Sequence, residues 1–436
     1  MIITYPATTQ KLSCIVAAAI ALGIVLSLAA TSQAQTENVL YSFTGGKDGG
    51  DPGGGLVRDA AGNFYGTTAS GGHNSNGVVF QLHPESGGGW TETVLHAFLS
   101  GNDGGTPSGG VVLDAAGNLY GGILISGPKG NGLIFKLTPQ TGGGWIKTNV
   151  HSFTGGNDGS SPQGNLTIDA AGNLYGATGS GGNSTNCFGK GCGVVFRLSP
   201  TSNGGWKYTL LHTFTGGKDG SSPRGGLALD AAGNLYGTAR NGGITSGCSG
   251  YGCGVVFKLA PTSQGEWKDT VLLAFGGGKA GQNPNGNLTL DAAGSVYGTT
   301  PQGNGGSACG GLACGTAFEL SPTNTNTWTP SLLHTFTGGT DGGTPPPGLT
   351  LSAGTLYGTT EEGGNLNCGV GIGCGTVYQL SPLSGGWQQT ILYSFTGGTD
   401  RGSPTSGVIL DASGNLYGET SLGGTNGWGT IYQLVP

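Results

Sequence analysis

Charged residues are scarce in this chain, in which 16 Lys and Arg and 22 Asp and Glu make up only 9% of 436 residues. The net charge of −6 leaves no basic surface to attract phosphate backbones, which argues against nucleic acid as a partner. Glycine is abundant, with 96 residues, about three times average usage. This excludes a protein of long helices, and the lack of a three-residue period excludes collagen. Strand-like apolar runs recur, so a turn-rich β protein remains.

Long apolar runs are absent after the N-terminus. Lys11 precedes an apolar stretch from Ile15 to Ala30, and the small residues Ser32-Gln33-Ala34 form a cleavage pattern. Residues 1–34 are therefore predicted to be a signal peptide cleaved after Ala34, and the chain is expected to be secreted or periplasmic, with no membrane attachment after removal of the signal. A retained membrane anchor is the alternative, which the short apolar core disfavours.

Eight of the nine cysteines follow this signal, and they fall in local pairs, each inside one repeat. An even count in an exported chain predicts disulfides formed in an oxidising compartment. A metal site is the alternative, but none of the eight has a His within ten positions. The predicted disulfides are Cys187–Cys192, Cys248–Cys253, Cys309–Cys314 and Cys368–Cys374.

One sequence unit of about 55 to 61 residues recurs through residues 35–436, which are predicted to form a single domain. The longer copies are those that carry a cysteine pair, so the extra residues belong to one loop and leave the repeated core unchanged. The outer segment of the seven copies starts at Val39, Val94, Asn149, Leu210, Val271, Leu332 and Ile391.

Each unit can be read as four short antiparallel strands. In one copy these are expected at Leu227–Asp230, Leu235–Thr238, Val255–Leu259 and Trp267–Phe275, with a tight turn at residues 230–234. A sheet of this size cannot bury both faces alone, but sheets stacked radially cover one another. The predicted fold is an all-β, seven-bladed β-propeller of four-stranded antiparallel blades. Two smaller sheets or a solenoid are the alternative.

The two ends of the chain support a closed ring. The last copy ends with Ile431–Pro436, after its third strand, whereas Asn38–Phe43 is a fourth strand with no blade before it. The N-terminal strand is therefore expected to complete the final blade and remove an exposed sheet edge.

Two recurring motifs resemble a known family. DAAGNLYG occurs at Asp114–Gly121, Asp169–Gly176 and Asp230–Gly237, and FTGGKDGSSP at Phe214–Pro223. Together they resemble the GloVer tandem-repeat family of exported bacterial proteins, often described by their varied C-terminal anchors, over Val39–Pro436. The resemblance implies a β-propeller-like architecture and no general activity. Nothing after Tyr432 looks like an anchoring signal, so release from the cell is expected.

Residues that recur in every copy are expected to serve the fold. One strand position holds His in four copies and Tyr or Leu in others, which indicates packing between blades and not catalysis. A Trp opens the outer strand of six copies, and blade-edge packing is favoured over sugar stacking. The residues are His96, His151, His212 and His334, and Trp90, Trp145, Trp206, Trp267, Trp328 and Trp387.

An Asp lies in the Gly-rich loop before each new blade in six copies. Such side chains often bond to backbone amides two residues further on, which fixes the turn. Calcium is the alternative cofactor, and Asp48 and Asp51 of the first loop are the candidate ligands because only that loop offers two carboxylates. The other loop Asp residues are Asp103, Asp158, Asp219, Asp341 and Asp400.

The cysteine loops and Asp loops should emerge on one face of the ring, where variability and disulfides concentrate. We expect the binding site on that face, with Trp428, which lies outside the repeat pattern, and Arg240 as candidate contacts. The leading hypothesis is a non-enzymatic, monomeric binding propeller for a polysaccharide or cell-surface polymer.

Two other functions stay open at this point. A glycan-active enzyme would need paired carboxylates, and Glu361, Glu362 and Glu419 are the candidates outside the repeat pattern. Adjacent Glu361 and Glu362 point to opposite sides of an extended strand, which weakens that pair. A structural or adhesive repeat protein without a discrete ligand is the third reading.

Overall fold

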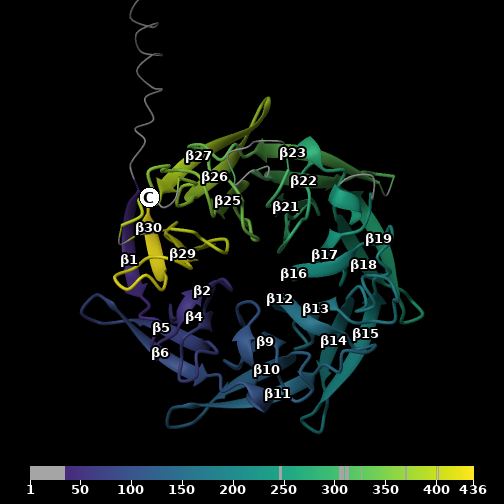
Figure 1. Ribbon diagram of the computed structural model, residues 1–436, viewed down its shortest axis with the longest axis horizontal. Helices are drawn as coiled ribbons and strands as arrows, with labels where there is room; N and C mark the ends of the chain where they lie inside the picture. Colours follow the sequence, from purple (N-terminus) through teal and green to yellow (C-terminus); the bar gives the residue numbers. More distant parts are fainter. Residues whose placement is uncertain are drawn as a thin grey trace, which may run out of the picture.

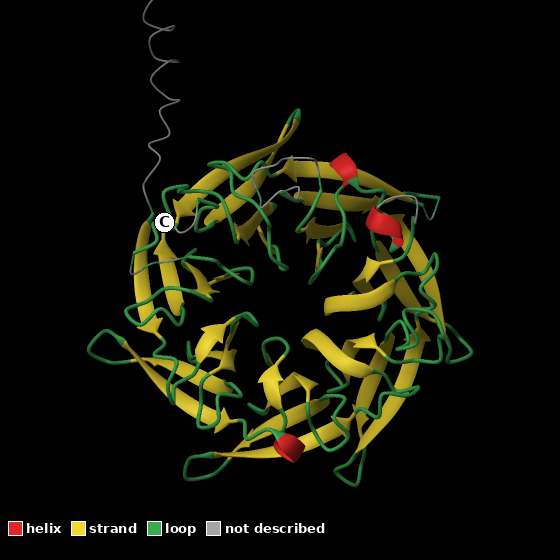
Figure 2. Cartoon of the chain, viewed as in Figure 1, coloured by secondary structure: helices red, strands yellow, loops and turns green. Residues whose placement is uncertain are grey.

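The computed structural model describes residues 35–436, apart from residues 245–247, 304–308, 310–313, 326, 369–370, 399 and 401. The predicted signal peptide, residues 1–34, lies outside the described residues. Seven antiparallel sheets surround one axis (Figure 1), so the prediction of an all-β, seven-bladed propeller is confirmed. Figure 2 shows how little helix accompanies the strands. Within the described ranges, no helix has the length and apolar character needed to cross a membrane.

Blades 1 to 7 follow chain order, and each has four ring positions from the axis outwards. The inner strands are β2 (Gly50–Pro52) with β3 (Val57–Arg58), β7 (Gly105–Pro107) with β8 (Val112–Leu113), β12 (Ser160–Ile168), β16 (Ser221–Leu229), β20 (Thr289–Leu290), β24 (Thr350–Ser352) and β28 (Ile409–Leu410). The second strands are β4 (Phe64–Ser70), β9 (Leu119–Ile125), β13 (Leu174–Ser180), β17 (Leu235–Asn241), β21 (Val296–Thr300), β25 (Thr355–Thr360) and β29 (Leu416–Thr420).

The outer half of each blade is more uniform. The third strands are β5 (Val78–Pro84), β10 (Leu133–Pro139), β14 (Val194–Pro200), β18 (Val255–Pro261), β22 (Thr316–Pro322), β26 (Thr376–Leu383) and β30 (Thr430–Val435). The outer strands are β6 (Trp90–Ala97), β11 (Trp145–Ser152), β15 (Trp206–Thr213), β19 (Trp267–Ala274), β23 (Trp328–Thr335), β27 (Gly386–Ser394) and β1 (Thr36–Ser42). Short 3₁₀ turns lie in loops of the described chain: η1 (Gly101–Asp103), η2 (Cys248–Gly250) and η3 (Gly278–Ala280).

The inner strand of blade 4 differs from its prediction. It starts at Ser221 instead of Leu227, pairs with β17 at both ends, and shifts register between Arg224 and Ala228. Gly225 and Gly226 lie within this register shift, where the strand bulges and comes close to its neighbours.

The ring closes as the chain ends predict. The N-terminal β1 pairs antiparallel with the C-terminal β30, from Thr36 opposite Val435 to Ser42 opposite Thr430. Blade 7 thus combines β28, β29 and β30 with β1 in one sheet. Both ends of the described chain are held by a single ladder of backbone hydrogen bonds.

The DAAGNLY motif builds the turn between the first two strands of a blade. In blade 4, Asp230 accepts hydrogen bonds from the backbone N–H of Ala232 and Asn234, both at 2.9 Å, and from the Asn234 side chain at 2.7 Å. The Tyr236 hydroxyl donates to the same carboxylate at 3.1 Å. These donors hold the pKa of Asp230 below its usual value although burial opposes them. The Asp is a structural residue of the turn.

The glycine of the same motif makes room for a large ring. An added Cβ on Gly237 would lie 2.5 Å from the Phe257 ring, and Gly66 has the same relation to Phe80. Both rings are fully buried. The Tyr-Gly pair of the second strand and the Phe of the third strand therefore form one packing unit, in which Tyr378 and Tyr432 replace the Phe in blades 6 and 7.

Apolar packing between blades completes the ring. Seven buried clusters each combine residues of two neighbouring blades, for example Val195 of blade 3 with Phe257 of blade 4. The Trp residues that open the outer strands take part, because Trp267 lies edge-on to Tyr175 of the preceding blade at 6.5 Å between ring centroids. The structure supports the packing interpretation of these Trp residues.

Near the axis, glycines allow the inner segments to touch. An added Cβ on Gly164 would collide with the backbone of Gly225, and one on Gly225 would lie 2.5 Å from Gly286. Gly54 and Gly407 are equally close to the backbone of a neighbouring blade. We call this ring of close backbone contacts the glycine collar.

The collar can be tested with a matched pair of substitutions. Gly164 and Gly142 both have positive φ, 71° and 95°, but an added Cβ on Gly142 meets nothing within 4 Å. Gly142→Ala should cost about 1 kcal/mol, from backbone strain alone. Gly164→Ala should cost at least about 2 kcal/mol more, because its methyl group collides with the next blade. Urea denaturation of both variants measures the difference, and equal losses would contradict a tight collar.

Candidate functional site

One hydrogen bond recurs between each blade and the next. A proline lies at or before the inner strand of each blade, as Pro223 does in blade 4. The residue before this proline has a positive φ of 53 to 65° and donates its backbone N–H to a loop carbonyl of the preceding blade. We call these bonds the latch. The donor and acceptor pairs, at 2.8 to 2.9 Å, are Thr106 to Asn76, Ser161 to Asn131, Ser222 to Cys192, Asn283 to Cys253, Thr344 to Cys314, Ser403 to Cys374 and Asp51 to Trp428.

The disulfide of a loop that accepts the latch also packs on the Gly-rich loop of the next blade. The four disulfides are present, and two of them show the pattern clearly: an added Cβ on Gly216 would lie 2.8 Å from Cys187 Sγ, and one on Gly397 would lie 2.6 Å from Cys368 Sγ. In blade 7 the indole of Trp428 takes this place, where it would collide with an added Cβ on Gly45. Trp428 therefore covers the loop of the next blade where other blades use a disulfide, and 45% of it stays exposed.

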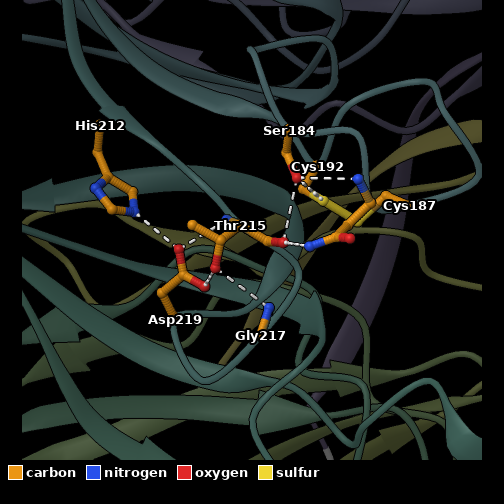
Figure 3. Close-up of a disulfide and its surroundings, with 8 residues drawn as sticks. Ser184, Cys187, Cys192, His212, Thr215, Gly217 and Asp219 are labelled. Carbon is orange, nitrogen blue, oxygen red and sulfur yellow. Dashed lines mark hydrogen bonds and ion pairs between the residues drawn. A yellow bond between two sulfur atoms is a disulfide. The ribbon is translucent and has the colours of Figure 1, made fainter.

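The Asp of each loop is tied to the strand before it (Figure 3). Asp219 accepts the backbone N–H of Thr215 at 2.8 Å and lies 3.4 Å from His212 Nε2. The expectation of amides two residues further on is wrong, because the carboxylate reaches back four residues to close the loop. Where Leu273 replaces the His, Ala280 replaces the Asp, so the pair is lost together. His and Asp are thus one structural unit.

The calcium candidates are engaged in the same way. Asp48 accepts the Tyr41 hydroxyl at 3.0 Å and the Thr44 backbone N–H at 2.8 Å. Asp51 lies three residues further on and contributes the latch to Trp428 through its backbone. Among the described residues, no three His, Cys, Asp or Glu side chains gather closely enough to hold a metal ion.

A groove opens between the disulfide loops of blades 3 and 4. Its volume is about 390 Å³, and it is lined by both loops and by the ends of β13, β16 and β17. Phe188 and Tyr251 lie at its margin with 82% and 58% of their surface exposed. Their ring centroids are 5.8 Å apart, and the two ring planes are inclined to each other by 48°.

The remaining lining of this groove is polar. Ser180, Ser222 and Asn241 contribute hydroxyl and amide groups, and Lys190 is the single charged residue among those that line it. The loop of blade 3 is held from below, because the side chains of Ser184 and Asn186 donate to the Thr215 carbonyl at 3.2 and 2.7 Å. The groove thus combines two exposed aromatic faces with fixed hydrogen-bonding groups.

The sequence analysis placed the disulfide loops and the Asp loops on one face but did not single out these two rings. The cysteine loops read CFGKGC and CSGYGC in blades 3 and 4, but CGGLAC and CGVGIGC in blades 5 and 6. An aromatic residue inside the disulfide loop is therefore specific to two neighbouring blades. Comparing the loops copy by copy would have revealed Phe188 and Tyr251.

The candidate carboxylates lie apart from this groove. Glu419 is fully buried, at the position where blades 1 and 6 carry Thr67 and Thr359, which donate to backbone carbonyls of the next blade. Its Oε1 accepts the Gly55 N–H at 2.5 Å and the Ser406 hydroxyl at 3.1 Å, and Oε2 has no partner among the described residues. Burial raises the pKa of Glu419 to about 7.

Glu361 and Glu362 belong to blade 6. Burial, followed by the neighbouring Glu362, raises the pKa of Glu361 to about 7. Glu362 pairs through its backbone with Gly343 of the inner segment. Neither residue lines the groove, and neither does Arg240, which lies on β17 next to Arg224. Trp428, Arg240 and the three Glu residues do not line a common pocket among the described pockets.

Comparisons with known proteins agree with the architecture. A sequence model described as the Gloeobacter/Verrucomicrobia repeat matches residues 21–247 and 188–372. No curated protein matches the chain.

Solved structures with the same fold include a fungal alcohol oxidase of the AA5 family in complex with copper, which is 13% identical, with 92% of this chain and 76% of that chain covered and a TM-score of 0.53. A protein of unknown function from Dyadobacter fermentans DSM 18053 is 12% identical, with 92% and 98% covered and a TM-score of 0.45. A putative oxidoreductase (glucose dehydrogenase) from Thermus thermophilus is 15% identical, with 92% and 100% covered and a TM-score of 0.41. At 13% identity, the likeness to the alcohol oxidase shows the fold alone.

The buried Glu419 predicts a specific pH dependence of stability. Its pKa is raised from 4.5 to about 7 in the folded chain, so the stability it contributes is complete below pH 4.5 and falls as the pH rises to about 7. Glu419→Gln keeps an oxygen for Gly55 and Ser406 but removes this dependence. The change in unfolding free energy between pH 4.5 and pH 8 should differ from that of the parent protein by about 3 kcal/mol.

Urea denaturation at the two pH values measures this difference. Glu266→Gln, which removes an exposed carboxylate of an outer hairpin, is the control and should leave the profile unchanged. Identical profiles for Glu419→Gln and the parent protein would show that Glu419 is ionised in the fold at neutral pH.

Proposed function

This chain belongs to the Gloeobacter/Verrucomicrobia repeat family, and for this member we propose a non-enzymatic binding function directed at carbohydrate, in the form of an extracellular polysaccharide or surface polymer. The observation that carries the proposal is the pair of exposed rings, Phe188 and Tyr251, at the groove of the two disulfide loops. Propeller architecture by itself assigns no activity.

The chemistry of the groove suits a sugar. The faces of pyranose rings are built of C–H groups and pack on aromatic rings, whereas their edges carry hydroxyls that need donors and acceptors. Phe188 and Tyr251 offer the faces, and Ser180, Ser222 and Asn241 offer the polar groups. Exposed aromatic residues on a polar surface are typical of interaction sites. One Lys among the lining residues favours a ligand with few charges.

The disulfides support recognition by fixing the loops before binding. Cys187–Cys192 and Cys248–Cys253 bracket Phe188 and Tyr251, and the latch ties each loop to the next blade. A loop that is already ordered loses little conformational freedom when a ligand arrives. Four disulfides also indicate an oxidising, extracytoplasmic environment. Export by a signal peptide cleaved after Ala34, as a monomer free of the membrane, is part of this proposal.

A polymer can contact more than one point of the ring. Trp428 is exposed on the loop of blade 7, in the structural position that the disulfides occupy in blades 3 and 4. A long chain that crosses this face can engage the groove and Trp428 together, and weak contacts then add through the polymer. Nucleic acid is not the expected ligand of the groove, because Lys190 is the single charged residue among those that line it.

The proposal predicts binding that depends on the two rings. The parent protein should retain at least one polysaccharide from a panel of insoluble bacterial and plant polymers in a pull-down assay. The double substitution Phe188→Ala and Tyr251→Ala should weaken that binding at least about tenfold, because exposed aromatic residues dominate contact energies. Unfolding midpoints should stay unchanged, since both side chains project into solvent.

Ile146→Ala is the matched control, because it removes an exposed apolar side chain from β11, outside the groove. This variant should bind like the parent protein. No retention of any polymer in the panel would refute the carbohydrate proposal. Retention that the double substitution leaves unchanged would refute the groove as the site.

A further inference from the structure

A second pocket lies at the axis of the ring, enclosed by the inner segments of all blades. Its volume is about 350 Å³, within the range of sites for small ligands. The glycine collar forms much of its wall, so backbone groups face the pocket directly. Polar side chains complete it, among them Gln163, Asn165, Arg224, Asn285, Asn287 and Ser406.

One position makes this pocket asymmetric. The residue that follows the inner proline is different in every copy of the repeat, although the proline itself recurs. Positions that serve the fold stay constant between repeats, so variation at a position that lines this pocket in six of the seven blades suits a specific function. In blade order the residues are Gly53, Ser108, Gln163, Arg224, Asn285, Pro346 and Thr405.

Two side-chain amides of the pocket have a fixed orientation. Asn165 Oδ1 accepts the Gly110 backbone N–H at 2.8 Å, and Asn287 Oδ1 accepts that of Gly226. A backbone N–H can only donate, so each amide must turn its oxygen to the collar. The Nδ2 groups of Asn165 and Asn287 then remain as donors, and neither has a protein partner in the described part of the chain.

Arg224, which lies between Asn165 and Asn287 in the sequence, is a cation without a counter-ion among the described residues. Arg224 lines the pocket on β16, and its Nε is buried with no partner among the described residues. It forms no ion pair with the carboxylates of the described ranges. Burial, followed by the nearby Arg240, lowers the pKa of Arg224. A bound anion would relieve both effects.

On the opposite side of the pocket, no Lys or Arg is among the described residues that line it. Figure 1 shows β16 and β29 on opposite sides of the axis. There the pocket is lined by Thr405 and Ser406, and the Ser406 hydroxyl lies 3.1 Å from the buried Glu419 Oε1. Hydroxyl groups and collar carbonyls on this side can bind the hydroxyls of a ligand. The pocket therefore pairs an anion-binding side with a hydroxyl-binding side.

We propose that the axial pocket binds a small hydroxylated carboxylate of the uronic acid class. The carboxylate group is held by the Arg224 guanidinium with the Asn165 and Asn287 amides, and the hydroxyls face Ser406 and Thr405. This site is separate from the groove of Phe188 and Tyr251, and its ligand is a single acid unit where the groove takes a polymer.

Isothermal titration calorimetry of the full chain, after signal removal, with D-glucuronate and with D-glucose tests the proposal. D-glucuronate should bind, and D-glucose should bind at least about tenfold more weakly, because it lacks the charge-assisted hydrogen bonds. Arg224→Gln should weaken D-glucuronate binding at least about tenfold for the same reason. No heat with D-glucuronate, or equal affinity for both sugars, would overturn the proposal.

Asn287→Asp gives a second test in which the fold is preserved. An Asp oxygen can still accept the Gly226 N–H, but the donor that faces the pocket becomes an acceptor that repels a carboxylate. D-glucuronate binding should be lost while the unfolding midpoint stays unchanged. Asn203→Asp adds the same charge on an exposed outer turn and should leave the affinity unchanged.

The proposals for the groove and for the axial pocket can be tested independently. Phe188→Ala with Tyr251→Ala should not change D-glucuronate affinity, and Arg224→Gln should not change polysaccharide retention. Unchanged D-glucuronate binding in both Arg224→Gln and Asn287→Asp would show that the anion binds elsewhere and would overturn the axial site.

Discussion

The latch is the interaction on which the rest of this structure depends. Each of these bonds is made by a residue other than glycine that adopts a positive φ directly before a proline, which is a strained conformation for an L-amino acid. The bond it makes fixes the distance between a blade and the loop of its predecessor. Around the ring, seven such bonds set the spacing at which the glycine collar closes and the apolar clusters between blades meet.

The side chains that pack over the latch differ between blades, although the backbone hydrogen bond is the same in each. A disulfide, an Asn or the indole of Trp428 can cover the glycine of the next loop, because the carbonyl that accepts the latch is part of the backbone. The side chains at this level are thus free to vary without disturbing the ring. Blades 3 and 4 use that freedom to present Phe188 and Tyr251, and blade 7 uses it to present Trp428.

The architecture could be predicted from the sequence because each repeat contains the residues that form its own turns and packing contacts. DAAGNLYG specifies a turn through Asp230 and a packing space through Gly237, and the unpaired strands at the chain ends specify closure. The inner strand of blade 4 was harder to predict, because Gly225 and Gly226 weaken the local strand pattern, whereas in the ring they serve a contact with other blades. The sites were hard to predict for the same reason. Spacing within one copy does not show that Phe188 lies beside Tyr251, or that Arg224 and Asn287 line one pocket at the axis.

The closing sheet has a further consequence. A sequence repeat begins with an outer strand, whereas a blade of the folded ring ends with an outer strand. The boundaries of repeats and blades therefore differ by one strand. A whole repeat can be gained or lost anywhere between β1 and β30 without altering either partner of that closing ladder. Closure therefore places no limit on how many blades the gene encodes. The ring size is set by the angle between successive blades and not by the ladder that joins the two chain ends.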